Sequence, residues 1–433
     1  MINKIRAVNS RQSLLENKAL LAILVTIYYL LVRLLYTQEI APANNFNVVG
    51  TYSLQSVDIL TVIFFSLMPL FFLPKYIDSP SSMISWMLYC FSYLPTSFFS
   101  IYYSDSIFSY CHLMLLLTLG LSVFRFSTLI RIHLARWKKV DFLNTDYFSM
   151  FFLTLFIVYY IWNLSGFSID LNFTNVYVRR LEAREVDLGI MAYLMVFIKT
   201  AFLVLAVYLW VICRKSLYFI VSMFGVIAIF AFDGTKATLL SAMILISYSF
   251  FASYFSIEAK RPSTILIVFL VLCAISLIEW NLLKSYVLSE YLVRRIAVMP
   301  GIINSYYFNH FDVFPEFFHV ADQVSYTIGL EYFGNAATNA NSGIWMDAYA
   351  KAGLIGIVLV SFFSGCIAIF LDTIIEKDKR LLGMLIGLMV GITWSEQALT
   401  TSILSGGILF YILLVFWINI SLRLNKYLTQ YEF

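Results

Sequence analysis

The chain consists mostly of apolar runs that are too long for the interior of an ordinary soluble domain. Of its 433 residues, 61% are hydrophobic and 12% are charged, whereas about a quarter of the residues of a soluble domain are charged. A helix needs about 20 apolar residues to cross a bilayer, because each residue advances it by about 1.5 Å. The runs are also far longer than the strands of a membrane barrel. The sequence therefore predicts an all-α, polytopic integral membrane protein.

We expect about twelve transmembrane helices, which form one membrane domain over residues 1–433. The expected spans are 19–36, 57–74, 82–103, 107–123, 147–164, 190–213, 216–232, 237–257, 262–279, 347–371, 381–398 and 404–422. The first run is too long for the apolar region of a cleaved signal peptide, so we expect it to be retained. Most connections are short, but residues 165–189 form a longer loop, and residues 280–346 form a long one between the ninth and tenth spans.

The distribution of basic residues predicts the orientation of these spans. If the N-terminus is cytoplasmic, 19 Lys and Arg residues fall on the cytoplasmic side and 8 on the opposite side. Lys and Arg are normally retained in cytoplasmic loops. Both termini are therefore expected in the cytoplasm, with the two longer loops on the outer side.

Most of the basic residues on the outer side lie in three clusters. These are Arg179, Arg180 and Arg184 in the first of the longer loops; Lys236 between the seventh and eighth spans; and Lys284, Arg294 and Arg295 in the long loop. Exported cations run against the normal charge bias, so these clusters are candidates for binding an anion.

The first two clusters are each open to two interpretations. Arg180 and Arg184 would share a helical face and repel each other unless an anion lay between them. Alternatively, Glu182 and Glu185 neutralise an ordinary solvated face. Lys236 stands at a predicted helix start, where free backbone N–H groups favour a phosphate, or it reaches toward the membrane interface.

The third cluster is followed by aromatic and amide residues. Lys284 and Arg295 are eleven residues apart, so they would share a face if the ninth span continued as a helix until Pro300-Gly301 ended it. Residues 304–311 then include Tyr306 and Tyr307. Aromatic rings beside amides and cations suit a sugar ligand, while an interfacial belt of Tyr and Phe is the alternative.

Four charged residues and three glycines stand out within the expected spans. A charge in a span is costly, which makes each a functional candidate, although side chains near span ends can reach water. Only Lys199 lies near mid-span; the others are Arg33, Glu279 and Glu396. The glycines Gly383, Gly387 and Gly391 repeat every four residues, which favours close helix packing inside the protein over a dimer contact.

The end of the long loop carries a recognisable pattern. It reads Arg294-Arg295-x-x-x-x-Pro300-Gly301-x-x-x-x-x-Tyr307-Phe308-x-x-Phe311, and then Asn339-Ala340-Asn341-Ser342-Gly343-x-x-x-Asp347-x-Tyr349-Ala350-x-x-Gly353-x-x-Gly356. This resembles the long periplasmic loop and following helix of Wzy-type oligosaccharide repeat-unit polymerases, enzymes of the bacterial inner membrane that assemble O-antigen and capsule. Gly234-Thr235-Lys236 resembles a small, basic turn of the same family.

The resemblance implies a glycosyltransferase of lipopolysaccharide or capsule biosynthesis. The donor would be an oligosaccharide on undecaprenyl pyrophosphate, and the acceptor hydroxyl would belong to a second lipid-linked unit. Membrane lipid and a chain-length regulator protein are possible partners, with no nucleic acid and no cofactor. A lipid-linked oligosaccharide flippase and an O-antigen ligase are the alternatives.

The expected site combines a cationic clamp with a base. Fixed cations would stabilise the charge that develops on a departing pyrophosphate. Arg294, Arg295 and His310 are the catalytic candidates, and Asp312, Glu316, His319 and Asp347 are weaker candidates for the base. The substrate-binding candidates are Arg179, Arg180, Arg184, Lys236, Lys284, Tyr306, Tyr307 and Asn341. No Asp-x-Asp motif or compact set of histidine ligands occurs in the sequence, so we predict no essential metal.

Overall fold

The computed structural model describes most of the chain as helix. It covers residues 2–44, 54–130, 148–164, 179, 182–183, 185–213, 216–255, 260–285, 287–311, 324–336, 338–375 and 379–416. No β-strand occurs within these ranges, and the predicted all-α fold is confirmed to that extent.

The α-helices follow one another along the chain with several π and 3-10 segments between them. The α-helices are α1 (Ile2–Leu35), α2 (Ala41–Asn44), α3 (Ser56–Leu67), α4 (Pro80–Leu88), α5 (Leu94–Phe99), α6 (Ile107–Ser127), α7 (Phe148–Leu164), α9 (Ile190–Phe197), α10 (Leu203–Cys213), α11 (Ser216–Asp233), α12 (Lys236–Tyr254), α13 (Pro262–Leu283), α14 (Met299–His310), α15 (Val324–Phe333), α16 (Ile344–Ile374), α17 (Arg380–Glu396) and α18 (Leu399–Leu404). The π-helical segments are η1 (Tyr36–Ile40), η3 (Tyr89–Tyr93), η5 (Ile198–Phe202) and η7 (Ser289–Val298). The 3-10 segments are η2 (Met68–Phe71) and η4 (Ser100–Tyr102).

Eight helices of the described chain are long and apolar enough to cross a membrane. They cover Lys18–Ala43, Ile107–Ser127, Ile190–Ile212, Ser216–Asp233, Ala237–Tyr254, Pro262–Leu283, Ile344–Ile374 and Leu399–Phe416. Three further predicted spans correspond to the shorter helices α3, α7 and α17, of 12, 17 and 17 residues. The span predicted at 82–103 corresponds to the consecutive segments from α4 to η4. The total of twelve spans stays a prediction.

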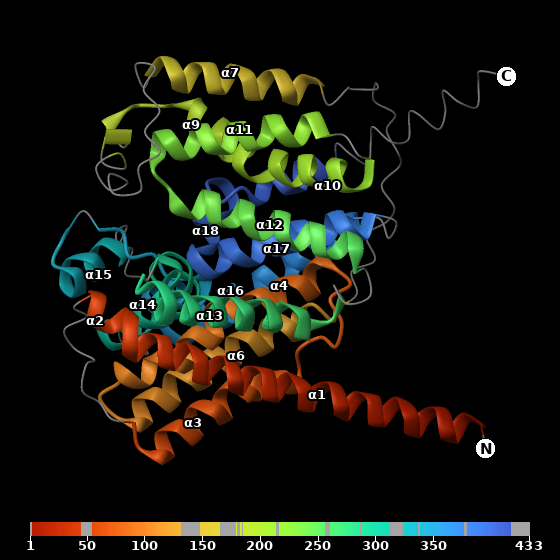
Figure 1. Ribbon diagram of the computed structural model, residues 1–433, viewed down its shortest axis with the longest axis vertical. Coiled ribbons are helices and arrows are strands. Elements are labelled where there is room, and N and C mark those ends of the chain that lie inside the picture. Colours follow the sequence, from red (N-terminus) through yellow and green to blue (C-terminus); the bar gives the residue numbers. More distant parts are fainter. Residues whose placement is uncertain are drawn as a thin grey trace.

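The long helices lie side by side, and the bundle is elongated across their axes (Figure 1). Helices α7, α9 and α11 lie at one end of the long axis, and α1, α3 and α6 lie toward the other. The turn between α11 and α12 lies at the same side of the bundle as α14 and α15, on the left in Figure 1. The N-terminus lies on the opposite side.

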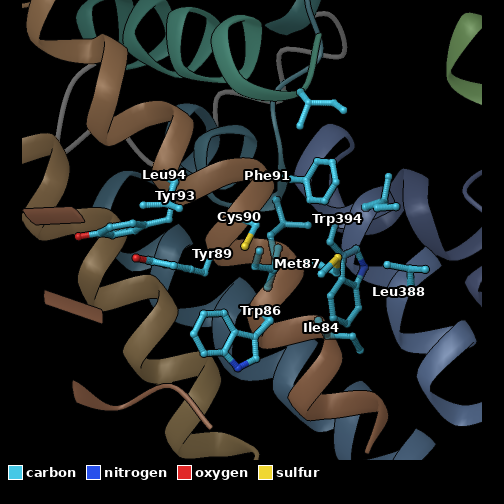
Figure 2. Close-up of a cluster of buried hydrophobic side chains, with 14 of the residues drawn as sticks. Ile84, Trp86, Met87, Tyr89, Cys90, Phe91, Tyr93, Leu94, Leu388 and Trp394 are labelled. Atoms are coloured by element: carbon cyan, nitrogen blue, oxygen red, sulfur yellow. The ribbon is translucent and has the colours of Figure 1, made fainter. Parts of the chain in front are cut away.

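The segment from α4 to η4 forms the centre of the bundle, because every residue from 80 to 103 is buried. Trp86, Tyr89 and Tyr93 point to one side of this segment, while Met87 lies beside Leu388 and Trp394 of α17 (Figure 2). Trp86 and Tyr93 satisfy their polar atoms by donating hydrogen bonds to the carbonyl oxygens of Pro74 and Phe65, both at 2.9 Å. This span is therefore enclosed by protein.

The glycine repeat of α17 permits this enclosure. A Cβ atom added to Gly387 would lie 2.7 Å from the carbonyl oxygen of Pro80, and one added to Gly391 would overlap Met87. The surface of α17 that carries these glycines thus packs directly against α4. The expectation that the repeat serves packing inside the protein is confirmed.

The described residues of the predicted long loop fold largely into helices that pack into the bundle. Gly301 lets α14 approach the backbone of Pro95 in α5 so closely that a Cβ atom would clash with it. Asn304 Nδ2 donates to Thr96 Oγ1 at 2.8 Å, which ties the same two helices together. The part of the chain predicted to bind substrate is therefore held by the core.

Two local predictions in this region are wrong. The ninth span does not continue as a helix, because α13 ends at Leu283 and Lys284 takes a left-handed conformation with φ 51°. Pro300-Gly301 does not end a helix either, since both residues lie in the first turn of α14. Proline is tolerated there because the first N–H groups of a helix have no partner within it.

Candidate functional site

A cavity of about 880 Å³ lies where five parts of the chain meet. It is lined by residues of five stretches: 183–199 with α9 and η5, 232–243 with the turn before α12 and the first half of that helix, 287–304 with η7 and α14, the loop at 339–343, and 395–397 at the end of α17. Asp233 ends α11, Ala237 lies in the first turn of α12, and Glu396 ends α17. The cavity therefore opens among helix ends on one side of the bundle.

Among the residues that the structure describes, two cations and two carboxylates line this cavity. Lys199 Nζ lies 3.8 Å from Asp233 Oδ2, with 25% and 17% of the two side chains exposed. Arg295 lies close enough to Glu396 for an electrostatic interaction. Each charge in this water-poor region is thus balanced by one of opposite sign, which lowers the cost of its burial.

Both cations lie on π-helical segments. Lys199 belongs to η5, within the long helix formed by α9 and α10, and Arg295 belongs to η7. A π segment inserts an extra residue in the helical turn and changes the direction in which a side chain points, and such segments are frequent at functional sites. This geometry turns Lys199 toward the cavity from the middle of an apolar helix.

The start of η7 is fixed by two carboxylates. Glu279 accepts hydrogen bonds from the backbone N–H groups of Val287, at 3.1 Å, and Leu288, at 2.9 Å. Ser289 donates its hydroxyl proton to Glu39 at the end of the first helix. These contacts hold the helix that carries Arg295, because they satisfy donors that have no partner within the helix.

Amide and hydroxyl side chains form another part of the wall. They are Asn304, Asn339, Asn341, Ser342 and Gln397. Gln397 Oε1 is buried and accepts no hydrogen bond from the residues that the structure describes. Such groups suit a ligand with many hydroxyls, since a buried polar atom without a partner is costly.

The remaining wall is apolar and reaches the outside of the bundle. Met195, Leu239 and Leu240 line the cavity, together with Met243 and Val287. Met243 and Val287 are 57% and 53% exposed, so the cavity is open on the side that these two residues form. An apolar chain could lie along this side.

The first cationic cluster is only partly described. Arg179 is buried, donates from Nη1 to the carbonyl oxygen of Ala231 at 3.0 Å, and packs its guanidinium over the ring of Phe230. It does not line the cavity, so its role in the structure is to fasten the loop to α11. Arg180 and Arg184 lie outside the described residues, although their neighbour Ala183 lines the cavity.

In the second cluster, the residues on either side of Lys236 line the cavity. Thr235 and Ala237 line it, and Lys236 between them begins α12. The side chain of Lys236 lies outside the described part of the structure. Thr235 donates from its N–H, at 2.8 Å, and from Oγ1, at 2.5 Å, to the carboxylate of Asp233, which fixes the tight turn.

The third cluster is divided by the structure. Arg295 lines the cavity, whereas Arg294 binds Glu290 at 2.6 Å. Lys284 is exposed beside the ring of Trp280, with Nζ 5.9 Å from the ring centroid. The predicted grouping of Lys284 with Arg295 fails because the helix between them is interrupted at Lys284.

The predicted base does not line the cavity. His310 Nδ1 lies 2.6 Å from Glu331 Oε2, at the far end of α14. Asn304, which does line the cavity, is six residues earlier, a distance of about 9 Å along the helix. Of the weaker candidates, Asp347 binds Lys351 at 2.9 Å, and Asp312, Glu316 and His319 lie outside the described residues.

The two tyrosines predicted to bind substrate, Tyr306 and Tyr307, contact residues outside the cavity. Tyr306 stacks on Tyr332 with 4.1 Å between ring centroids, and its burial raises its pKa to about 12. Tyr307 donates its hydroxyl to the carbonyl oxygen of Ala340 at 3.0 Å, next to Asn341. Neither ring lines the cavity, whereas Asn341 does.

Sequence reasoning found Lys199 and Glu396 as costly charges but did not place them in the site. It also missed Asp233, Asn339 and Gln397 as parts of the wall. A signal existed for Lys199 alone, because a mid-span cation requires a partner. The pairing with Asp233 is set by the packing of η5 on α11, which the sequence does not display.

The chain matches no protein-family model, and comparison with curated proteins and with solved structures finds no significant match. No group of three or more His, Cys, Asp or Glu residues suited to a metal ion occurs in the described part of the chain.

Proposed function

We propose that this protein polymerises oligosaccharide repeat units carried on a polyprenyl pyrophosphate, at the periplasmic face of a bacterial inner membrane. The observation that carries the proposal is the convergence of segments around residues 183, 235 and 295 on one cavity. These segments include or adjoin residues of the three cationic clusters predicted for the outer side, and Arg295 is the cluster member whose described side chain lines the cavity. The products would be O-antigen or capsular polysaccharide, as the resemblance to Wzy-type polymerases implies.

The charges of the cavity suit a diphosphate. Arginine can donate two parallel hydrogen bonds to a phosphate, and lysine supplies a compact positive charge. Lys199 forms an ion pair with Asp233, and Arg295 is near Glu396. A diphosphate would compete with the carboxylates for these cations, and it gains charge as its bond to the sugar breaks, so the cations favour the transition state.

The uncharged walls suit the other two parts of such a substrate. The amides of Asn339, Asn341 and Gln397 can bind sugar hydroxyls, and the apolar wall beside Met243 and Val287 can receive the first isoprene units. The opening on the side of these two residues would let the lipid tail remain in the membrane. One cavity thus offers a fitting surface to lipid, diphosphate and sugar.

The position of the cavity favours an enzyme over a flippase. A transporter that alternates between two faces is expected to bind its substrate near the middle of the membrane, between related halves. Here the lining includes the last residues of α11 and α17 and the first turn of α12. These helix ends lie on the same side of the bundle as α14 and α15 (Figure 1), which supports a site that is reached from one face of the membrane.

Purified protein in lipid nanodiscs, supplied with polyprenyl-pyrophosphate repeat units, tests the proposal. We expect a ladder of glycans that grow by one repeat unit per step, with release of polyprenyl pyrophosphate. Movement of intact units across vesicles without lengthening would overturn the proposal in favour of a flippase. Transfer of a single preformed glycan to a different acceptor would instead identify a ligase.

A further inference from the structure

The two carboxylates of the cavity differ in what already binds them. Asp233 accepts hydrogen bonds from the N–H and the hydroxyl of Thr235 and also contacts Lys199. Glu396 interacts electrostatically with Arg295, and the structure gives it no hydrogen bond from the residues described. Asp233 is thus occupied in holding the turn, while the oxygens of Glu396 remain able to accept a proton.

The backbone around Glu396 is held firmly. Gly343 packs so closely on the end of α17 that an added Cβ atom would lie 2.7 Å from the carbonyl oxygen of Ser395 and 2.9 Å from that of Trp394. Trp394 Nε1 donates to Ser402 Oγ at 3.0 Å, which ties the same turn to α18. Glu396 therefore has a fixed place beside the loop that supplies Asn341.

The neighbouring residue, Gln397, supplies a polar atom that none of the described residues binds. Gln397 leaves the helix in an extended conformation, with φ −136° and ψ 151°, and its N–H donates to the carbonyl oxygen of Thr393 at 2.9 Å. Its side-chain Oε1 is buried at the cavity wall and is bound by none of the described residues. Gln397 Oε1 is thus an acceptor available to a sugar hydroxyl in the cavity that Glu396 also lines.

We infer that Glu396 is the general base that accepts the proton of the acceptor hydroxyl, an assignment that rests on the proposed function. The acceptor oxygen forms a bond to the anomeric carbon of the donor sugar while the bond from that carbon to the diphosphate oxygen breaks. The electron pair of the broken bond leaves with the diphosphate, which Arg295 and Lys199 bind, and the hydroxyl proton moves to a Glu396 oxygen. The transferred proton, the negative charge of the leaving diphosphate, and the bonds that form and break are thus all handled by groups of one cavity.

The geometry assigns this role to Glu396 instead of His310. A general base must lie within hydrogen-bond reach of the proton it removes. His310 is bound to Glu331 at the other end of α14 and does not line the cavity. Glu396 lines the same cavity as both cations that would hold the leaving group.

The substitution Glu396→Gln tests the assignment, because it keeps the shape of the side chain and removes its ability to take a proton. We expect the rate of chain extension to fall about 100-fold or more, while the affinity for polyprenyl diphosphate, measured separately, changes less than about twofold. Glu396→Asp should retain part of the activity. Glu331→Gln is the matched control, since it alters a carboxylate outside the cavity, and its extension rate should stay near that of the unmodified protein.

A pH profile separates a base from a positioning residue. Of the described residues, the charged and titratable groups that face the cavity with Glu396 are Lys199, Asp233, Tyr291 and Arg295. Extension by the unmodified protein should rise with pH over the acidic range as the base ionises, and Glu396→Gln should lose this rise. Normal extension by Glu396→Gln, or an unchanged acidic limb, would overturn the assignment.

The results also distinguish this inference from the proposed function. If the unmodified protein extends chains and Glu396→Gln does so equally well, only the base assignment fails. Loss of diphosphate binding in Glu396→Gln would make Glu396 a positioning residue for Arg295 and would also overturn its role as base. If the unmodified protein neither binds polyprenyl diphosphate nor extends chains, the proposed function itself fails.

Discussion

Arg294 and Arg295 are neighbours in the chain but have different surroundings. Arg294 binds Glu290, one helical turn earlier, at 2.6 Å, whereas Arg295 lines the cavity beside Glu396. We therefore expect Arg295→Ala to reduce chain extension by about 100-fold, the usual cost of removing one group that stabilises developing charge. Arg294→Ala should reduce it by less than about fivefold.

The two variants should be compared at equal protein level, by following the ladder of products over time. Each removes one arginine from the same helix, so effects on expression or on net charge are matched. A larger loss for Arg294→Ala than for Arg295→Ala would show that the cavity is not the reaction site. Equal, small losses of chain extension would show that neither arginine belongs to the cationic clamp for the diphosphate.

At the residue scale, the sequence alone predicts part of the difference between Arg294 and Arg295. Glu290 stands four residues before Arg294, and that spacing favours an ion pair on a helix. The contact between His310 and Glu331 spans 21 positions and depends on how α15 folds back on α14. Sequence periodicity does not reveal a contact over this separation, so only the structure shows that His310 lies outside the cavity.

The position of helix α17 depends on a glycine whose side chain is only a hydrogen atom. An added Cβ atom on Gly391 would overlap Met87, and α4 is buried on all sides. We expect Gly391→Leu to destabilise the fold by about 1 to 3 kcal/mol, the usual cost of overpacking a filled interior. A thermal unfolding assay in detergent should show a lower midpoint.

A lipid-facing position supplies the control for this experiment. Leu359 is 47% exposed on α16, so Leu359→Phe adds volume without meeting the core and should leave the midpoint nearly unchanged. Equal stability of Gly391→Leu and the unmodified protein would mean that α4 and α17 can separate at little cost.

At the scale of elements, run length and composition were sufficient to predict most of the helices. The four-residue glycine repeat was also sufficient to predict close packing within the protein. The interruption at Lys284 was not predictable in the same way. Lysine has no preference for a left-handed conformation, and the turn is held by Glu279, whose contacts with Val287 and Leu288 form only after the chain reverses.

For the whole molecule, the decisive question is which side of the membrane the cavity faces. The N-terminus and the group formed by α14, α15 and the α11–α12 turn lie on opposite sides of the bundle (Figure 1). Combined with the excess of basic residues predicted for the cytoplasm, this arrangement predicts that the cavity faces the opposite side, which is the periplasm if the proposed function is right. A polymerase that uses translocated lipid-linked units requires that placement.

Cysteine labelling can test the orientation in living cells. Asn335 is exposed in the connection after α15, and Lys260 precedes α13 at the other end of the bundle. In a background whose native cysteines are replaced, Asn335→Cys should react with a membrane-impermeant maleimide in intact spheroplasts, and Lys260→Cys should react only after lysis. The reverse pattern would turn Arg295 and Lys199 toward the cytoplasm, where no translocated donor could reach them, and the proposed polymerase would then be untenable even if the cavity binds a diphosphate.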